Sequence, residues 1–359
     1  MPLAPPKRIT LVLQVADVLR RGIAHGELSG RLPPEKELAH QLQVSRMTLR
    51  AGMKILIREG LIEVAKGRRT LITSPRKISG RGRRTFRVGV ITPTTYGDLP
   101  FAGYYEIYRT LVQRAGLEVQ FFPGSRFYGA DPSRLLEKLI PESQIDLWVV
   151  CMSTAVLQRW FARQGIPVLV DGSCVTEKPL PALDIDYRAL CRHAVGTLRR
   201  LGHRRVVYLS AGARTGGDLA SEQGFAEGCR LAPALDSSVV ICEVSAAAVS
   251  RALARLFQSA APPTAILTGW PGISTATLTY LMNRGLRVPE DVSVISRDDD
   301  RSFDFLVPSL ARYTFDLNSY ARRLAKMTLK HFDGTLRPEQ QLIVPNFVNG
   351  CSLGSRKSS

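Results

Sequence analysis

The sequence has no long apolar run, and its N-terminus lacks the continuous apolar core and cleavage site of a secretory signal, because Gln14 and Asp17 interrupt it. We therefore expect a cytoplasmic protein with no membrane partner. The cysteines are scattered, form no CxxC pair and are absent from residues 1–87. Such spacing is typical of reduced core thiols and not of a disulfide framework or a zinc site.

Motifs of the common enzyme classes are also missing. The sequence holds no P-loop, no GxSxG and no paired spacing among its histidines. Lysine is sparse after residue 87, and none has the context of a Schiff-base lysine. We therefore predict a protein that is not an enzyme and uses no cofactor or metal.

Acidic residues are scarce in the first quarter of the chain. Residues 1–87 hold 19 Lys and Arg against 6 Asp and Glu, a net +13, whereas residues 88–359 hold 30 against 25, a net +5. With 359 residues, 45% of them apolar, the chain can bury a large core and divide into two or three domains. A basic domain without an adjacent apolar segment favours nucleic acid as its polyanionic partner.

Three amphipathic helices are predicted in this basic quarter. The first covers residues 9–25, the second begins after Pro34 and covers about residues 35–43, and the third follows Ser45, which suits an N-cap. The apolar residues at helical spacing are Leu11, Val15, Val18, Leu19, Ile23, Leu38, Leu42, Leu49, Met53, Leu56 and Ile57. We expect these side chains to face a common core.

The start of the third helix presents Arg46, Thr48 and Arg50 on its exposed face. Two short helices joined by a tight turn, the second with donors near its N-terminus, have the arrangement of a DNA-recognition motif. The following sequence LIEVAKGRRTLIT alternates apolar and polar residues, which predicts a small wing-like hairpin with a basic tip. Residues 73–87 are rich in Pro, Gly, Ser and basic residues, and read as a flexible linker whose charges either follow phosphates or keep the tether solvated.

These motifs resemble the winged helix-turn-helix of the GntR family of bacterial transcription regulators over about residues 8–74. The matching residues are Leu32, Pro33, Glu35, Glu37, Leu38, Ala39, Val44, Ser45, Arg46, Thr48 and Arg50. The resemblance implies DNA contacts at Lys36, Ser45, Arg46, Thr48, Arg50 and Gly67. The basic wing adds Lys66, Arg68 and Arg69 as expected contacts. Lys36 stands where the family has an arginine, and a lysine keeps the charge but cannot donate the paired hydrogen bonds of a guanidinium. Arg69 stands where the family has the second glycine of the wing.

From Phe86 onward, strand patterns alternate with helix patterns. The predicted strands are FRVGVIT, LEVQFF, DLWVVC, IPVLVD, RRVVYLS, SSVVICEV, TAILTG and VSVIS. The predicted helices cover residues 105–115, 133–140, 155–164 and 188–201 and the segments around Phe225, Leu253 and Leu281. This α/β alternation predicts two lobes of parallel sheets covered by helices, with a ligand cleft between the lobes.

Five landmarks in this region resemble the effector domain of the LacI/GalR family, whose fold is similar to periplasmic sugar-binding proteins. They are LGHRRVVYL, the pair Gly224–Phe225, PPTAIL, RGLRVPEDVSVIS with Asp298, and PSL at residues 308–310. A GntR-type reader joined to such a domain is the arrangement of arabinose-repressor-like regulators. The resemblance implies a homodimer, a double-stranded inverted-repeat operator and a sugar or sugar-like effector.

The predicted domains are a DNA-binding domain over residues 1–74, a basic linker over 75–86, an effector-binding and dimerisation domain over 87–353, and a disordered tail over 354–359. This organisation predicts a ligand-controlled transcription regulator, most simply a repressor. The alternative is a DNA-binding regulator or architectural protein whose sensor-like domain serves dimerisation or a protein partner and binds no sugar.

The family's ligand contacts are only partly retained. Ser221 stands where a sugar-binding arginine is expected, and Pro271, after Trp270, stands where an aspartate is expected, whereas Asp298 matches the family's acidic cleft residue. Without those two bidentate partners, a typical hexose fits less well. The candidate ligand residues are Tyr104, Ser153, Asp171, Ser221, Glu222, Trp270 and Asp298, with Phe101, Arg214 and Arg301 as further strand-end candidates.

Overall fold

The computed structural model describes residues 15–16, 18–19, 22–23, 28, 30–58, 62–63, 70–72, 86–94 and 102–356. The chain divides into two compact units, Met1–Arg84 and Thr85–Ser359, which we call the N-terminal unit and the effector unit. Their boundary falls within the segment predicted to be a linker. Among the helices described, none is long and apolar enough to cross a membrane.

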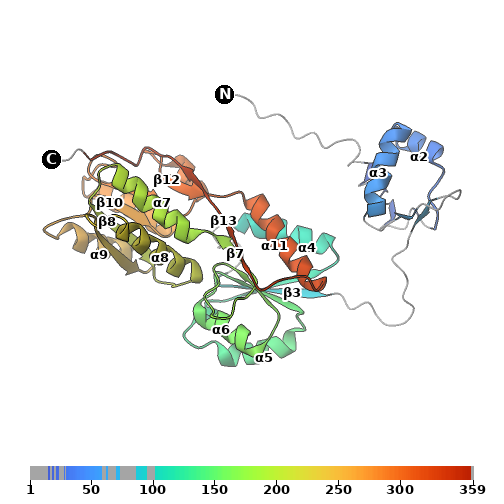
Figure 1. Cartoon of the computed structure of the whole chain (residues 1–359), viewed down its shortest axis with the longest axis horizontal. Helices are drawn as coiled ribbons and strands as arrows, with labels where there is room; N and C mark the ends of the chain where they lie inside the picture. The colour runs from blue at the N-terminus through green and yellow to red at the C-terminus, as the bar shows by residue number, and fades with distance from the viewer. Residues whose placement is uncertain are drawn as a thin grey trace. The chain divides into compact units, whose positions relative to one another are not determined.

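Among its described residues, the N-terminal unit contains helices α2 and α3 and a two-stranded antiparallel sheet (Figure 1). These elements are α2 (Glu35–Gln41), α3 (Arg46–Arg58), β1 (Ile62–Glu63) and β2 (Leu71–Ile72). The paired strands have the antiparallel register Ile62 opposite Ile72 that a wing requires. Their core contains Val15, Ala16, Leu19, Leu32, Leu38, Ala39, Leu49, Met53, Leu56 and Ile62.

Two of the predicted core positions are wrong. Val18 is 42% exposed and Ile57 is 40% exposed, although their neighbours Leu19 and Leu56 are fully buried. Successive residues of an α-helix point about 100° apart, so a large side chain beside a buried one lies at the edge of the buried face or outside it, as Val18 and Ile57 do. Helical spacing of apolar residues therefore overestimates the width of the core-facing stripe.

The first lobe of the effector unit is a six-stranded parallel sheet in the order β13-β7-β6-β5-β3-β4. Its strands are β3 (Arg87–Thr92), β4 (Glu118–Pro123), β5 (Leu147–Cys151), β6 (Val168–Asp171), β7 (Ala182–Ile185) and β13 (Gln340–Ile343). Its helices are α4 (Ala102–Arg114), α5 (Ser133–Ser143), α6 (Ala155–Gln164) and α11 (Leu317–Phe332). Helices α4 and α11 lie side by side on one face of the sheet, and α5 and α6 cover the other (Figure 1).

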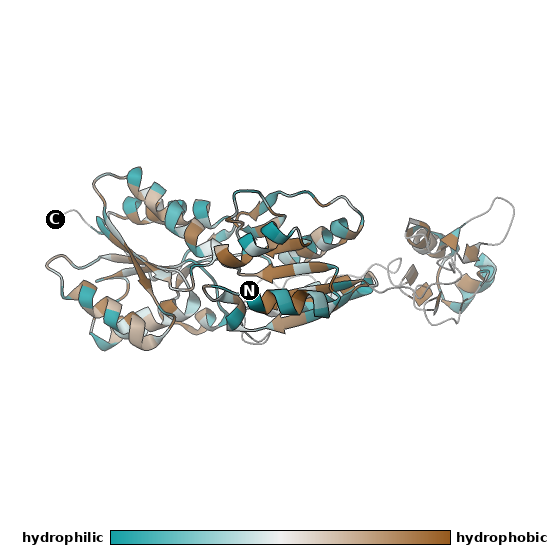
Figure 2. Ribbon diagram, turned by 90° about the horizontal axis from the view of Figure 1, so that it is seen from below, coloured by the Kyte–Doolittle hydropathy of each residue, from teal (hydrophilic) through white to brown (hydrophobic). Residues whose placement is uncertain are grey.

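The second lobe is a six-stranded sheet in the order β14-β12-β11-β10-β8-β9, parallel except for β14. Its strands are β8 (Arg205–Ala211), β9 (Asp236–Cys242), β10 (Ala265–Thr268), β11 (Ser293–Ser296), β12 (Ala311–Thr314) and β14 (Asn346–Val348). Its helices are α7 (Tyr187–Arg200), α8 (Gly216–Arg230), α9 (Ala246–Phe257) and α10 (Pro271–Asn283). In both lobes the strands are the most hydrophobic elements, as expected for sheets covered on both faces (Figure 2).

The chain passes between the two lobes three times. It crosses between β7 and α7, between β12 and α11, and between β13 and β14. The sequence patterns did not predict β7, α11 or the short strands β12, β13 and β14. The missed strands have only three or four residues, and polar residues interrupt each of them, whereas the recognised strands are extended apolar runs.

The C-terminal segment contradicts the prediction of a disordered tail from residue 354. The carbonyl of Gly354 accepts a hydrogen bond from His203 Nε2 at 3.1 Å, and the N–H of Gly354 donates to Ser293 Oγ at 3.0 Å. Arg356 N–H donates to the carbonyl of Leu201 at 2.6 Å. Residues 354–356 therefore belong to the second lobe. Burial lowers the pKa of His203 to about 4, so this imidazole is neutral and structural at neutral pH.

Candidate functional sites

The N-terminal end of α3 is held in a defined conformation. Ser45 Oγ accepts a hydrogen bond from the Thr48 backbone N–H at 3.1 Å and shares a second, side-chain hydrogen bond of 2.7 Å with Thr48 Oγ1. These contacts confirm the predicted N-cap and fix the first turn of the helix. Arg46 and Arg50 are exposed on this turn and the next.

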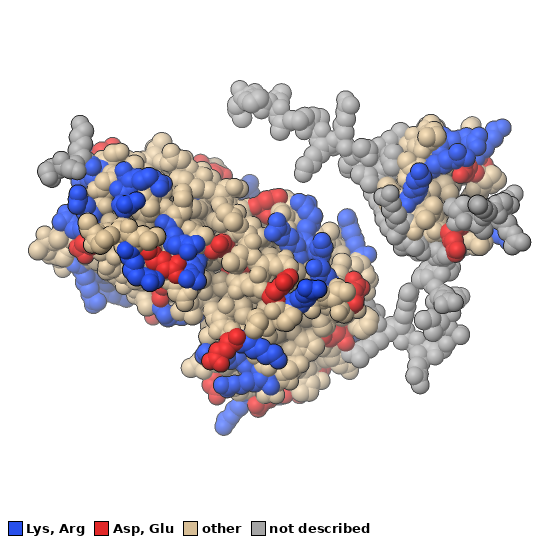
Figure 3. Space-filling view, viewed as in Figure 1, with Lys and Arg blue, Asp and Glu red and all other residues tan. Residues whose placement is uncertain are grey.

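Arg50 is restrained without being buried. Its Nε donates to Glu35 Oε2 at 2.8 Å, while the arginine side chain stays 53% exposed. This ion pair joins the exposed faces of α2 and α3, and Lys36 is exposed beside Glu35. The Lys and Arg side chains of the unit gather in a band on the face seen in Figure 3. This band has the sign and the helix-start location that a DNA-contacting face requires.

The four predicted wing contacts, Lys66, Gly67, Arg68 and Arg69, lie outside the described residues. The described part of the wing consists of β1 and β2, which pair on either side of that segment. The DNA contacts of the wing tip therefore stay predictions.

The effector unit has a cavity at the junction of its two lobes. It is lined by Tyr104, Met152, Asp171, Gly172, Asp184, Ile185, Tyr187, Thr215, Gly217, Trp270, Arg297, Phe315 and Tyr320. Asp171 ends β6, Asp184 lies near the end of β7, and Arg297 follows β11. The cavity therefore lies at the carboxyl ends of parallel strands, where open α/β sheets bind ligands. Its volume of about 70 Å³ leaves room for several water molecules.

Asp171 is surrounded by tyrosine hydroxyls. Tyr104 donates to Asp171 Oδ2 at 2.7 Å, Tyr320 donates to Oδ1 at 2.6 Å, and Tyr105 also donates to Oδ2. Burial raises the pKa of the Asp171 carboxyl, and the three tyrosine hydrogen bonds oppose that rise. The aspartate thus links α4 and α11 to the end of β6.

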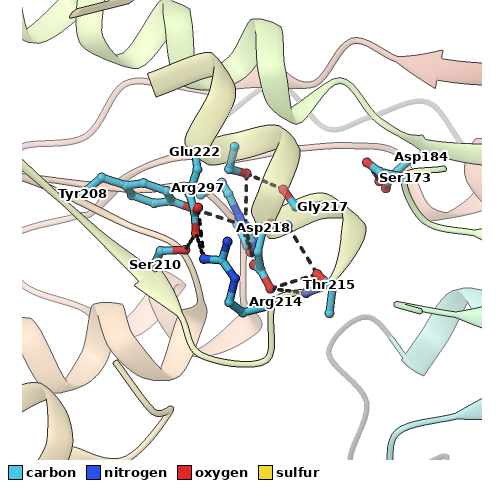
Figure 4. A network of polar contacts seen from close by, with 12 residues as sticks. Ser173, Asp184, Tyr208, Ser210, Arg214, Thr215, Gly217, Asp218, Glu222 and Arg297 are labelled. Atoms are coloured by element: carbon cyan, nitrogen blue, oxygen red, sulfur yellow. Dashed lines mark hydrogen bonds and ion pairs between the residues drawn. The ribbon is translucent and has the colours of Figure 1, made fainter. Parts of the chain in front are cut away.

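Arg297 is the centre of a buried polar network in the second lobe (Figure 4). Its Nη1 donates to Asp218 Oδ1 at 2.9 Å and to Ser221 Oγ at 3.1 Å, and its Nη2 donates to Asp298 Oδ2 at 2.8 Å. The guanidinium also lies 4.6 Å from the centre of the Tyr187 ring. Although burial opposes it, the charge of Asp298 helps to hold the pKa of Arg297 well above its usual value. The guanidinium therefore stays charged.

Asp184 has a different environment. Its Oδ2 accepts from Ser173 Oγ, and its Oδ1 accepts from the Ile185 N–H at 2.8 Å. Figure 4 shows the Ser173–Asp184 pair apart from the Arg297 network. Burial raises the pKa of the Asp184 carboxyl to about 7, although both hydrogen bonds oppose the rise. No cation among the described residues forms an ion pair with Asp184.

The structure brings three of the predicted ligand residues to the cavity, namely Tyr104, Asp171 and Trp270. The other four are not among its lining residues. Ser153 accepts from Gln158, Ser221 donates to the Gly217 carbonyl and accepts from Arg297, Glu222 pairs with Arg214, and Asp298 pairs with Arg297. Of the further candidates, Phe101 lies outside the described residues, and Arg214 and Arg301 are absent from the lining.

Sequence reasoning missed Arg297, Asp184, Tyr187, Phe315 and Tyr320. The most informative omission is Arg297, because its Nη1 lies 3.1 Å from the oxygen of Ser221, where the family arginine was expected. The guanidinium of Arg297, directly after β11, therefore lies next to the position at which the family has an arginine. An arginine directly after the buried strand VSVIS was the available signal, since a buried strand end rarely holds an unpaired charge.

Comparison with known proteins agrees with both halves of this architecture. Residues 11–72 match the gntR family of bacterial regulatory proteins, and residues 195–353 match the periplasmic binding protein-like domain. The chain joins a GntR-family domain to a periplasmic-binding-protein-like domain. Both resemblances proposed from the sequence are thereby confirmed, as is the α/β fold class.

Two curated relatives each match one part of the chain. Catabolite control protein A of Priestia megaterium is 25% identical over 168 residues, which are 45% of this chain and 51% of that protein. The HTH-type transcriptional repressor NagR of Bacillus subtilis (strain 168) is 39% identical over 70 residues, which are 19% of this chain and 29% of that protein. The chain therefore spans about half of the first relative and under a third of the second.

A solved structure shares the fold of nearly the whole chain. The transcriptional regulator CelR-cellobiose complex is 20% identical, covers 96% of this chain and 100% of its own, and has a TM-score of 0.66. At this identity the likeness concerns the fold alone, and the ligand has to be argued from this chain's own cavity.

Proposed function

We propose that this protein is a sequence-specific transcription repressor whose affinity for its operator is controlled by a small ligand in the inter-lobe cavity. The observation that supports this proposal most directly is the cavity, which is lined by Asp184 from one lobe and Arg297 from the other. The same chain also has an exposed basic helix, α3, with an N-cap at Ser45. The NagR relative, which matches a 70-residue segment, is named a repressor. We place the protein in the bacterial cytoplasm, on the nucleoid when DNA is bound.

In this proposal α3 enters the major groove. Arg46, Thr48 and Arg50 face base edges, and Lys36 and the wing residues Lys66 to Arg69 contact the backbone or minor groove. A homodimer formed through the effector units presents two such readers to an inverted repeat. The cavity has room for several water molecules between residues of both lobes, so a small ligand that replaces them contacts both lobes. A ligand that binds one lobe arrangement better shifts the population and, with it, the DNA affinity.

The test is DNA binding by the full chain with and without ligands. Fragments selected from a random DNA pool define the operator, and fluorescence anisotropy then measures its affinity while candidate ligands are added. A saturable change in operator affinity with one ligand class is expected. Specific DNA binding that no ligand alters would instead favour the alternative, in which the sensor-like domain serves dimerisation or a protein partner.

Replacing Arg50 tests the recognition face. If Arg50 reads a base, Arg50→Ala weakens operator binding by roughly 1–3 kcal/mol and relaxes specificity at one position. The matched control is Arg109→Ala, because Arg109 also forms an exposed 2.8 Å ion pair, with Glu106, but in the effector unit. Glu35→Gln separates loss of the ion pair from loss of the DNA contact. Equal weakening on every DNA sequence reassigns Arg50 to a phosphate.

An exposed apolar patch on the second lobe supports the homodimer. Met282, Phe305 and Val307 are 69%, 80% and 92% exposed. Met282 and Val307 line a groove with Leu278, Leu286 and Leu306, and Phe305 directly precedes Leu306 in the sequence. Clustered apolar exposure of this kind is typical of an interaction surface, and a second copy is the partner that symmetry favours.

Charging this patch tests its role. The double variant Phe305→Asp, Val307→Asp should sediment as a monomer and lose operator affinity, because the two readers no longer bind as one molecule. Leu231→Asp is the control, since Leu231 is 77% exposed but lies at the end of α8. A double variant that sediments as the wild type does would place the dimer interface elsewhere.

A further inference from the structure

The buried charges around the inter-lobe cavity do not balance. Arg297 is within ion-pair distance of two carboxylates, Asp218 at 2.9 Å and Asp298 at 2.8 Å, so its positive charge is already matched. Asp171 and Asp184 also line the cavity, and both are at most 5% exposed. Arg297 is the single Lys or Arg in the described lining. When both carboxyls are ionised, the cavity therefore has an excess of negative charge.

The remaining wall is largely aromatic. Tyr320 lies between two other lining rings, with centroid distances of 4.9 Å to Tyr104 and 5.4 Å to Phe315. Tyr187 and Trp270 complete the aromatic lining. Faces of aromatic rings attract cations, and groups of such rings are a recurrent means of recognising ammonium ions. The Tyr187 ring already has one cation, Arg297, over its face.

Gly217 keeps space open beside this acidic wall. A Cβ atom at Gly217 would lie 3.1 Å from the Tyr187 ring and 3.8 Å from Asp184 Oδ2. The first residues of α8 thus approach Asp184 and Tyr187 with no side chain between them. A larger residue at this position would fill the space next to the carboxylate that has no cation partner.

We propose that the ligand of this cavity is a compact organic cation, with a protonated or quaternary ammonium group against Asp184 and Asp171 and its remaining atoms on the aromatic rings. This inference rests on the proposed function of the cavity as the effector site, and it narrows the class of effector. Anionic sugars such as uronates and sugar phosphates fit poorly, because the one lining arginine is matched by Asp218 and Asp298 and the other lining charges would repel an anion.

The test compares ligands of similar size that differ in charge. Glucosamine is paired with glucose, choline with its neutral isostere 3,3-dimethylbutanol, and glucuronate supplies an anion. Binding to the full chain at neutral pH is followed by titration calorimetry and by the melting temperature at millimolar ligand. We expect saturable binding of at least one cation, at least tenfold weaker binding of its neutral partner, and no binding of glucuronate.

Two variants locate the cation. Asp184→Asn should weaken cation binding at least tenfold while the neutral partner is unaffected, and Gly217→Val should abolish binding by filling the space. Glu118→Gln is the control, because Glu118 is exposed on β4, away from the cavity. The melting temperatures of the unliganded variants show whether each has folded.

The outcomes separate this inference from the proposed function. Equal or tighter binding of the neutral partners, or absence of saturable binding by both cations, overturns the cation class, and a different ligand that alters operator affinity would still support the proposed regulator. Cation binding that depends on Asp184 but leaves operator affinity unchanged supports the inference and contradicts the proposed regulation.

Discussion

Replacing Arg297 with methionine should lower the free energy of unfolding of the effector unit by about 3–5 kcal/mol. The methionine has a similar length but cannot neutralise Asp218 and Asp298, both of which are at most 4% exposed. Ser221 also loses a buried donor at 3.1 Å. Removing one member of a buried ion cluster costs more than the cluster contributes, because the remaining charges stay desolvated.

The measurement is urea unfolding of the full chain, with the effector unit followed by near-UV circular dichroism. The triple variant Arg297→Met, Asp218→Asn, Asp298→Asn should recover much of the loss, since amides are buried at a lower cost than carboxylates. Arg214→Met is the matched control, because its ion pair with Glu222 is partly exposed, with the arginine side chain 43% exposed, and should contribute at most about 1 kcal/mol. Equal losses for Arg297→Met and Arg214→Met would contradict a charged, desolvated cluster.

Replacing Asp184 with asparagine should stabilise the unliganded protein at neutral and alkaline pH. The folded pKa of about 7 lies above the usual 3.8 of an aspartate. Below pH 3.8 the carboxyl is protonated in both states and has no effect on the pH dependence. Between about pH 4 and 7 the unfolded chain releases a proton that the folded chain retains, so stability falls as pH rises. Above pH 7 the full cost, on the order of 4 kcal/mol, is present.

The difference between wild-type and Asp184→Asn unfolding free energies isolates this group from others that titrate, including His203. The difference should be small near pH 4, grow in favour of the variant up to about pH 7, and then level off. Asp236→Asn is a suitable control, because Asp236 is exposed at the start of β9. A pH-independent difference would show that Asp184 is not held protonated by burial. If the variant is more stable but no longer binds cations, the Asp184 carboxylate lowers the stability of the unliganded protein and is retained because it binds the ligand.

The sequence predicted those features that depend on neighbouring residues. Ser45 was recognised as an N-cap because the cap bond to Thr48 spans only three residues, and the alternating strands were recognised because fully buried strands are apolar throughout. The positions that failed depend on distant partners. Arg297 reaches Ser221 across 76 positions, and Tyr320 reaches Asp171 across 149, so no local pattern indicates either contact.

The same distinction explains the ligand site. Tyr104 and Asp171 were predicted from their places near strand ends, and Trp270 from its place beside the residue aligned with a family aspartate. In the structure Tyr104 lies within α4 and not in a loop. Asp184 was missed because β7 was not recognised as a strand, since this aspartate itself interrupts the short apolar run ALDI. A family correspondence indicates which positions line a site. Which charged groups meet there also depends on residues that are distant in the sequence, as Arg297 and Asp184 are.

The three passages of the chain between the lobes limit how the cavity can open. Each is short, with residue 186 between β7 and α7, residues 315–316 between β12 and α11, and residues 344–345 between β13 and β14. The strands beside them are paired, β7 with β13 and β12 with β14. Three short connections beside paired strands favour a bend of one lobe against the other over larger rearrangements. We therefore expect an occupant of the cavity to act mainly through this bend, with its size and its contacts to the two lobes together setting how far the lobes open.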